Sequence, residues 1–449
     1  MRAYLQKYTS AAPLAVFRVI FGLMLLTSTV RFVASSWVRD LYISPRFFFP
    51  FYGFEFVRPL GEWTYLLFAV CGISALLLAI GWHYRLASVA LFVSFTYIEL
   101  IDKSTYLNHY YFVSLLCFML IFLPANTMFS VDAWQNKALR AGQIPAWCLD
   151  SVRIIVCMLY LYAGIAKLNS DWLLHALPLK IWLPAKNDIL LIGPLFNHLE
   201  TAYFFSWIGC IYDLSIGLLL WNRHTRPYAY ASVVVFHLLT SLLFPIGMFP
   251  YIMIVTALVF FPAAFHQKLI DRVCRLLRLP SAIIRPAGYY RFPAWLQPVL
   301  HAVFIAFFAF QITFPFRYLL YPGELFWTEE GYRFSWRVML MEKAGYTQFT
   351  VTDATGKRQI VNNNDFLTSL QEKMMSTQPD MILQYAHMLR DHYAARGFTH
   401  PHVYVDSYVA LNGRTGKPLI APDVDLAKQT DTFRHKSWIT PFDNEIKGL

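Results

Sequence analysis

Several ionisable side chains lie inside or beside apolar runs of this 449-residue sequence, where they can do chemistry. Charged groups are costly in apolar surroundings, so residues of this kind are functional candidates by default. A lysine held away from water is more readily a neutral amine, which is a base. The candidate reaction is therefore proton abstraction from an apolar molecule. The candidates are Arg18, Asp102-Lys103, Asn108-His109, Lys167, Asp213 and His237.

Each candidate also has a purely structural interpretation. Lys167, near a helix end, could extend its amine to lipid headgroups, and His109 could donate to a neighbouring carbonyl at the membrane interface. Asp213 and His237 could each satisfy a hydrogen bond between helices. Arg18 could be the partner of a buried acid or carbonyl. The residue types alone leave both interpretations open.

Motifs of common soluble enzymes are missing from the sequence. There is no HExxH, GxSxG, P-loop or GxGxxG pattern. The six cysteines form no CxxC pair, so neither a zinc site nor a disulfide framework is predicted. We therefore expect chemistry that uses no metal ion.

The composition predicts a polytopic membrane protein. Hydrophobic residues make up 57% of the chain and charged residues only 14%, whereas soluble domains carry roughly 25% charged residues. These values exclude a disordered chain, a coiled coil and an ordinary soluble enzyme. Nine apolar segments are predicted as membrane helices. They cover residues 13–33, 62–81, 86–101, 108–124, 151–167, 203–221, 228–244, 246–264 and 295–320.

The basic residues predict how the helices are oriented. The formal net charge is +11, and the basic residues concentrate in short loops, where membrane topology explains them better than nucleic-acid binding does. Alternate loops from the N-terminus carry most of them, which places the N-terminus in the cytoplasm. Residues 265–294 are the most basic loop and are predicted to be an amphipathic hairpin on the membrane surface. After nine spans the C-terminus is extracytoplasmic.

The character of the sequence changes after residue 320. We predict a membrane helical domain over residues 1–320 and a small extracytoplasmic α+β domain over residues 321–449. Alternating strands around turn residues predict hairpins, and amphipathic stretches predict helices. The expected elements are a hairpin over 346–361, two helices over 364–395 separated near Pro379, and a hairpin with strands 402–411 and 417–420.

This topology brings two candidates to the same side of the membrane. His109 begins a helix on the outer side, and Lys167 ends one there. We expect them to share a chamber near the outer leaflet, open to lipid at its side and covered by the extracytoplasmic domain. Such a chamber suits proton abstraction from a lipid-soluble substrate.

At these residues the sequence resembles the vitamin K-dependent γ-glutamyl carboxylases, in their bacterial form with a horizontally transferred transmembrane (HTTM) domain. The resemblance runs over nearly the whole chain, and the order and spacing of its stretches make it specific. The stretches include Phe17-Arg18, Asp102-Lys103-Ser104, Asn108-His109, Ser130-Val131-Asp132, Ala163-Gly164, Lys167-Leu168, Asp171-Trp172, Asp213-Leu214-Ser215, Phe236-His237, Ile246-Gly247-Met248-Phe249, Trp327-Thr328, Tyr332, Ser335-Trp336, Val424-Asp425 and Ser437-Trp438.

The resemblance implies a reaction. Enzymes of that family oxygenate reduced vitamin K, a menaquinol or phylloquinol type of naphthoquinol, to its epoxide with O2. The strong base formed on the way removes a γ-proton from a peptide glutamate, which takes up CO2. The quinone carries the hard chemistry, so the protein makes only the first, easier deprotonation. The implied partners are a lipid-soluble quinone, a glutamate-containing peptide or protein and membrane lipids, without nucleic acid.

The resemblance also implies roles for the candidates. The family's catalytic lysine falls on Lys167, and its Asn-His pair falls on Asn108 and His109. His237 matches a further family histidine and is expected to bind substrate. The segment that handles the glutamate falls on three residues with the same expected role, namely Tyr332, Ser335 and Trp336.

Two features depart from the animal enzymes, and two other functions compete. Ala166 stands where the animal enzymes have a second lysine, and the outer domain is much shorter than the animal one, which binds a propeptide. One alternative is a quinol epoxidase or oxygenase that carboxylates nothing. The other is a non-enzymatic lipid-binding or transport protein. A transporter predicts paired inverted repeats with broken helices at mid-membrane, and we see none in the sequence. We expect a multi-pass protein of a bacterial plasma membrane.

Overall fold

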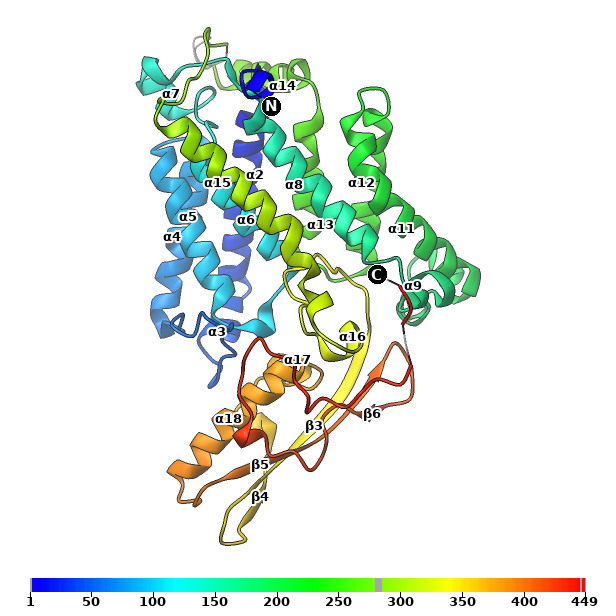
Figure 1. Ribbon diagram of the computed structural model, residues 1–449. Helices are drawn as coiled ribbons and strands as arrows, with labels where there is room; N and C mark the ends of the chain where they lie inside the picture. Colours follow the sequence, from blue (N-terminus) through cyan, green and yellow to red (C-terminus); the bar gives the residue numbers. More distant parts are fainter. Residues whose placement is uncertain (1, 279–284, 445, 449) are drawn as a thin grey trace.

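The computed structural model describes residues 2–278, 285–444 and 446–448. A bundle of long helices has a small sheet domain at one end (Figure 1), which confirms the predicted fold class. Each of the nine predicted apolar segments is largely helical. The corresponding helices are α2 (Ala12–Ala34), α4 (Thr64–Ile80), α5 (Tyr84–Leu100), α6 (Asn108–Phe122), α8 (Ala146–Ile165), α11 (Leu199–Trp221), α12 (Arg226–Leu243), α13 (Phe249–Ala257) and α15 (Leu296–Thr313).

Not all of these helices meet the requirement for crossing a membrane alone. Among the described residues, five helices are long and apolar enough. The number is six if α13 and α14 (Ala263–Leu277), which are bent by 113° at their junction, count as one span. The other segments form shorter or more polar helices, such as the 15-residue α6. They pack beside longer neighbours in the bundle, α5 against both α4 and α6 (Figure 1).

The two ends of the bundle differ in what they carry. The N-terminus and α14 lie at one end, and the sheet domain lies at the other (Figure 1). Helix α14 buries His266, Ile270 and Cys274 on one face and is therefore amphipathic, as predicted for the start of the basic loop. Residues 279–284 of that predicted hairpin lie outside the described residues. Short helices connect the longer ones: α1 (Arg2–Leu5), α3 (Trp37–Tyr42), α7 (Val131–Gln135), α9 (Ser170–His175), α10 (Leu179–Trp182) and α16 (Leu325–Thr328).

Two small sheets complete the fold. Strands β1 (Tyr8–Ser10) and β2 (Gln143–Pro145) pair at the end that carries the N-terminus. The C-terminal domain holds a four-stranded antiparallel sheet in the order β4-β3-β5-β6. Both predicted hairpins and both predicted helices are confirmed. Their bounds are β3 (Lys343–Thr352), β4 (Arg358–Ile360), β5 (His402–Leu411), β6 (Lys417–Pro418), α17 (Ser369–Met375) and α18 (Pro379–Ala395).

Close packing of α8 on α11 positions the residues of interest. A Cβ added at Gly164 would lie 2.8 Å from the backbone nitrogen of Leu214, so only glycine permits this approach. Small residues allow helices to approach in this way inside membranes. Arg18 has the structural role considered above, because its guanidinium donates to the carbonyls of Leu78, at 2.9 Å, and Phe129.

Candidate functional site

An apolar pocket lies between α8, α11 and α12, and Val338 and Met339, which precede β3, also line it. Its walls are mostly leucine and aromatic side chains, and it holds about 890 Å³ of unfilled space including its mouth. A pocket of this kind with a few convergent polar groups is the default place for a small ligand. The polar residues that line it are Tyr160, Lys167, Asp213, His237 and Thr240.

Lys167 lies two residues after the end of α8, and its amine is held inside the protein. The Nζ atom donates to Asp213 Oδ2 at 2.8 Å and to the Ala163 carbonyl at 3.1 Å. It also lies 5.2 Å from the centre of the Trp172 ring. Because the side chains of Lys167 and Asp213 are only 8% and 7% exposed, this is a buried ion pair rather than a headgroup contact.

His237 forms a second polar pair in the same pocket. Its Nε2 atom lies 2.8 Å from the hydroxyl of Tyr160, while its buried Nδ1 atom has no hydrogen-bond partner among the described residues. A neutral imidazole that accepts at Nε2 carries its proton at Nδ1. With Tyr160 as donor, His237 therefore offers an N–H group to a ligand.

The Asn108-His109 pair starts α6, and neither residue is among those lining the apolar pocket. The Phe249 ring, which does line it, contacts both histidines, with ring centres 5.7 Å from His109 and 5.7 Å from His237. The side chain of Asn108 instead donates to the carbonyl of Arg337 at 2.9 Å. The structure thus brings Lys167 and His237 into one pocket, whereas His109, which was expected to share a chamber with Lys167, is not among the residues that line it.

Residues 332–339, here called the partition segment, line two pockets. Val338 and Met339 line the apolar pocket, whereas residues 332–334 line a second, polar one. Three residues of the segment have left-handed backbone angles, with φ of 59° at Phe334, 61° at Trp336 and 53° at Met339. Such strain in non-glycine residues collects at functional sites. The partition segment is therefore a functional candidate on backbone grounds as well.

The three predicted glutamate-handling residues take different positions in this segment. Tyr332 lines the polar pocket. Ser335 donates its hydroxyl to the Tyr332 carbonyl. The Trp336 ring is fully buried, with its centre 5.0 Å from that of Tyr111 and 6.2 Å from that of Phe112 on α6. Ser335 and Trp336 hold the segment in place, and neither lines either pocket.

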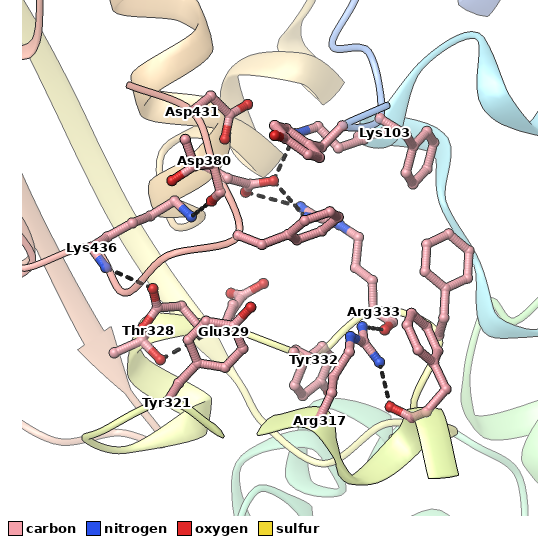
Figure 2. A pocket seen from close by; sticks show the side chains of 18 of the residues that line it. Lys103, Arg317, Tyr321, Thr328, Glu329, Tyr332, Arg333, Asp380, Asp431 and Lys436 are labelled. Carbon is pink, nitrogen blue, oxygen red and sulfur yellow. Dashed lines mark hydrogen bonds and ion pairs between the residues drawn. The ribbon is translucent and has the colours of Figure 1, made fainter. Parts of the chain in front are cut away.

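The polar pocket lies between the bundle and the C-terminal domain, and charged residues from both line it (Figure 2). Asp380 forms two ion pairs through its Oδ2 atom, with Lys103 Nζ at 2.6 Å and with Arg333 Nη1 at 2.7 Å. Burial by itself raises the pKa of Asp380, but Arg333 and Lys103 lower it far below its ordinary range. Lys103, which the sequence analysis singled out, therefore joins the two domains.

Two cations of the polar pocket have no carboxylate within ion-pair distance in the described part of the chain. Arg317 donates to the carbonyls of Phe314, at 3.1 Å, and Arg333. Lys436 donates through Nζ to the Thr432 carbonyl at 3.2 Å. Figure 2 shows both residues at the pocket. They are available to an anionic ligand.

Sequence reasoning missed part of this arrangement. Tyr160 lies on α8, seven residues before Lys167, which follows the end of that helix, and a spacing of about two helical turns was the available signal. The cations Arg317 and Lys436 belong to segments far apart in sequence, so no local pattern indicates that they share a pocket. Asp213 does form a buried hydrogen bond, and its partner is Lys167.

These features define an integral membrane protein with an apolar pocket inside its helical bundle and a polar pocket between that bundle and its C-terminal domain. Residues 6–265 match the HTTM domain. Residues 296–445, which begin with α15, match the lumenal domain of vitamin K-dependent gamma-carboxylase. Because the first match covers more than half of the chain, the protein belongs to the HTTM family, and the two matches together are those of a carboxylase-family protein with an HTTM domain. No solved structure matches the chain.

Proposed function

We propose that this protein is a vitamin K-dependent γ-glutamyl carboxylase-like enzyme. It oxygenates a reduced naphthoquinone to its epoxide with O2 and carboxylates a peptide glutamate with CO2. The observation that carries the proposal is the buried pair of Lys167 and Asp213 in an apolar pocket, which the partition segment separates from a polar one. The two family matches support the same reaction class.

The pair of Lys167 and Asp213 takes the proton of the quinol hydroxyl. With Asp213 ionised, the carboxylate accepts it and the ammonium of Lys167 remains beside the oxygen anion. With Asp213 protonated, the neutral amine accepts it. Either way the pair gains one proton and ends with a cation facing the anion, which a dry, low-dielectric pocket makes strongly stabilising.

The other polar groups orient the quinol. His237 donates through Nδ1 to a quinol oxygen, because Tyr160 occupies its Nε2 atom. The leucine and aromatic walls exclude water and so protect a strong base from being quenched. His109 contacts Phe249, whose ring also contacts His237, and it assists the same deprotonation.

The glutamate binds in the polar pocket. Arg317 and Lys436 receive its carboxylate, because among the described residues neither of them has a carboxylate within ion-pair distance. Tyr332 lies in the same pocket and belongs to the partition segment. The same segment also lines the apolar pocket, so the glutamate and the base formed on the quinone meet at this segment.

A single assay tests the proposal. Purified protein is incubated with reduced vitamin K, O2, labelled bicarbonate and a glutamyl peptide, and both epoxide and fixed label are measured. We expect both products, and we expect Lys167→Ala to lower both by about 10²–10⁴-fold, the usual contribution of a general base. Lys180→Ala, an exposed lysine of α10, is the matched control.

Other outcomes of this assay are equally informative. Epoxide without fixed label would identify a quinol epoxidase that carboxylates nothing. Absence of epoxide from the wild-type protein would contradict the proposal as a whole. Near-wild-type epoxide formation by Lys167→Ala at neutral pH would move the base elsewhere.

A further inference from the structure

The connector that carries Lys167 is held from outside the membrane bundle. Residues 166–171, here called the lysine connector, run from the end of α8 into the first turn of α9. Within the connector, Asn169 ties the two ends together. Its Nδ2 atom donates to the Ala166 carbonyl at 2.9 Å, and its Oδ1 atom accepts from the Trp172 backbone nitrogen at 2.9 Å. A shift of one end is therefore transmitted to Lys167.

The C-terminal domain contacts this connector through hydrogen bonds to Asp171. The loop after β5 supplies Arg414, which donates to both carboxylate oxygens of Asp171 at 2.7 Å and 2.6 Å. Asn412 of the same loop donates to Oδ2 at 2.7 Å. A bidentate guanidinium fixes a carboxylate in orientation as well as in position. Asp171 is only 1% exposed, so solvent weakens these bonds little.

Residues near the C-terminus grip the connector at a second point. The backbone nitrogen of Ser170 donates to the Lys447 carbonyl at 2.7 Å, and that of Lys447 donates to the Ser170 hydroxyl at 3.0 Å. Gly448 lies so close that an added Cβ would be 2.3 Å from the Leu168 carbonyl. Four consecutive connector residues, 168–171, thus contact the C-terminal domain.

We propose that Asp171, Arg414 and Asn412 are positioning residues, through which the C-terminal domain sets the place of the Lys167 amine in the apolar pocket. This inference rests on the proposed function, since it assigns Lys167 to proton removal from the quinol. The amine itself is bound to Asp213 and lies beside the Trp172 ring. Asp171, Arg414 and Asn412, here called the clamp, fix the position of the Lys167 amine relative to the bound quinol. A misplacement of about 1 Å can lower the rate of a chemical step by about 10²-fold.

The charge state of the clamp is constant over the range of an assay. Burial by itself raises the pKa of Asp171, but the hydrogen bonds from Arg414 and Asn412 bring it below its ordinary value. Asp171 therefore stays ionised from mildly acidic to alkaline pH. Activities of a variant at different pH values are therefore compared with Asp171 in one charge state.

The test is the pH profile of epoxide formation by Arg414→Gln in the full-length protein. We expect kcat to fall about 10- to 100-fold at neutral pH, with an unchanged KM for reduced vitamin K. The loss should shrink to less than about threefold at alkaline pH, because a quinol that ionises unaided does not need a well-placed amine. Arg414→Lys, which keeps the charge and loses the bidentate geometry, should be intermediate.

The control is Lys417→Gln, in the same hairpin. Lys417 pairs with Asp443 at the surface, where the two side chains are 38% and 67% exposed, and this variant should match the wild type. A loss in Arg414→Gln that is equal at all pH values would mean general distortion and would overturn the clamp. A wild-type kcat in Arg414→Gln, together with an inactive Lys167→Ala, would also overturn the positioning role of the clamp. If Lys167→Ala itself is active at neutral pH, Lys167 is not the base. The proposed function then fails at this residue, and the clamp has no catalytic amine to position.

Discussion

Asp213 is the carboxylate that neutralises Lys167 inside the apolar pocket. Asp213→Asn should lower epoxide formation by about 10²–10³-fold, because the pair can no longer take up a proton at the acid and the cation is left unpaired. Parallel measurement of quinol binding should show little change, since the apolar walls remain. Asp150→Asn, at the start of α8 in a pair with Arg153, is the control. A wild-type rate in Asp213→Asn would exclude the Asp213 carboxylate as the proton acceptor and would leave the neutral amine of Lys167 as the base.

Arg317 and Lys436 should act on the peptide alone. Arg317→Gln and Lys436→Gln are each expected to raise the KM for a glutamyl peptide about 10-fold or more, because a charge-assisted hydrogen bond to the carboxylate is lost. The KM for reduced vitamin K should stay unchanged. Arg390→Gln, in an exposed pair on α18, serves as the control. Equal losses for both substrates would indicate a structural role.

Asp102 should make stability depend on pH. Burial raises the pKa of this carboxyl to about 6, partly offset by bonds from Ser104 and Gln371, against about 3.9 in an unfolded chain. The folded state therefore holds the proton more tightly, and the wild type loses stability as pH rises from 4 through 6. Between pH 4 and 7, the stability of Asp102→Asn relative to wild type should increase by up to about 3 kcal/mol. Thermal unfolding in detergent measures this, and a constant difference would contradict it.

Helices α8 and α11 decide whether the pair can form at all. Gly164 allows their backbones to approach, because an added Cβ would lie 2.8 Å from Leu214 atoms. Gly164→Val should separate the two helices and lower epoxide formation at least about 10-fold, since Lys167 and Asp213 lie on opposite sides of this contact. Leu218→Ala, a lipid-facing position of α11 that is 78% exposed, should be silent. Unchanged activity in Gly164→Val would show that the helices tolerate a wider spacing.

The whole molecule has its N-terminus and α14 at one end and the sheet domain at the other (Figure 1). We predict that the sheet domain is extracytoplasmic. In intact cells, a membrane-impermeant maleimide should label Thr355→Cys, in the β3–β4 turn, and should not label Arg275→Cys on α14. The described native cysteines are buried or half-buried and should label weakly. Labelling of both introduced cysteines from one side would contradict this topology.

Local patterns were sufficient for much of the architecture. The nine apolar segments became helices, because the length and hydropathy of a run act within one segment. Both hairpins of the C-terminal domain formed around their turn residues for the same reason. Among the described residues, fewer than nine helices are long and apolar enough to span a membrane alone. The shorter and more polar helices are shielded by packing against neighbouring helices rather than by their own hydropathy.

Lys167, Asp213 and His237 could be singled out from the sequence by itself, because an ionisable group within apolar sequence is unusual wherever it occurs. Only the tertiary structure decided what each one meets. The hydrogen-bonded partners lie far apart in sequence. Lys167 and Asp213 are separated by 46 residues, Tyr160 and His237 by 77 residues, and Asp171 and Arg414 by 243 residues. Such partners depend on which helix faces pack together and on how the C-terminal domain docks on the bundle. A single sequence carries no periodic signal for contacts at these separations, so packing alone turns separate polar residues into a site.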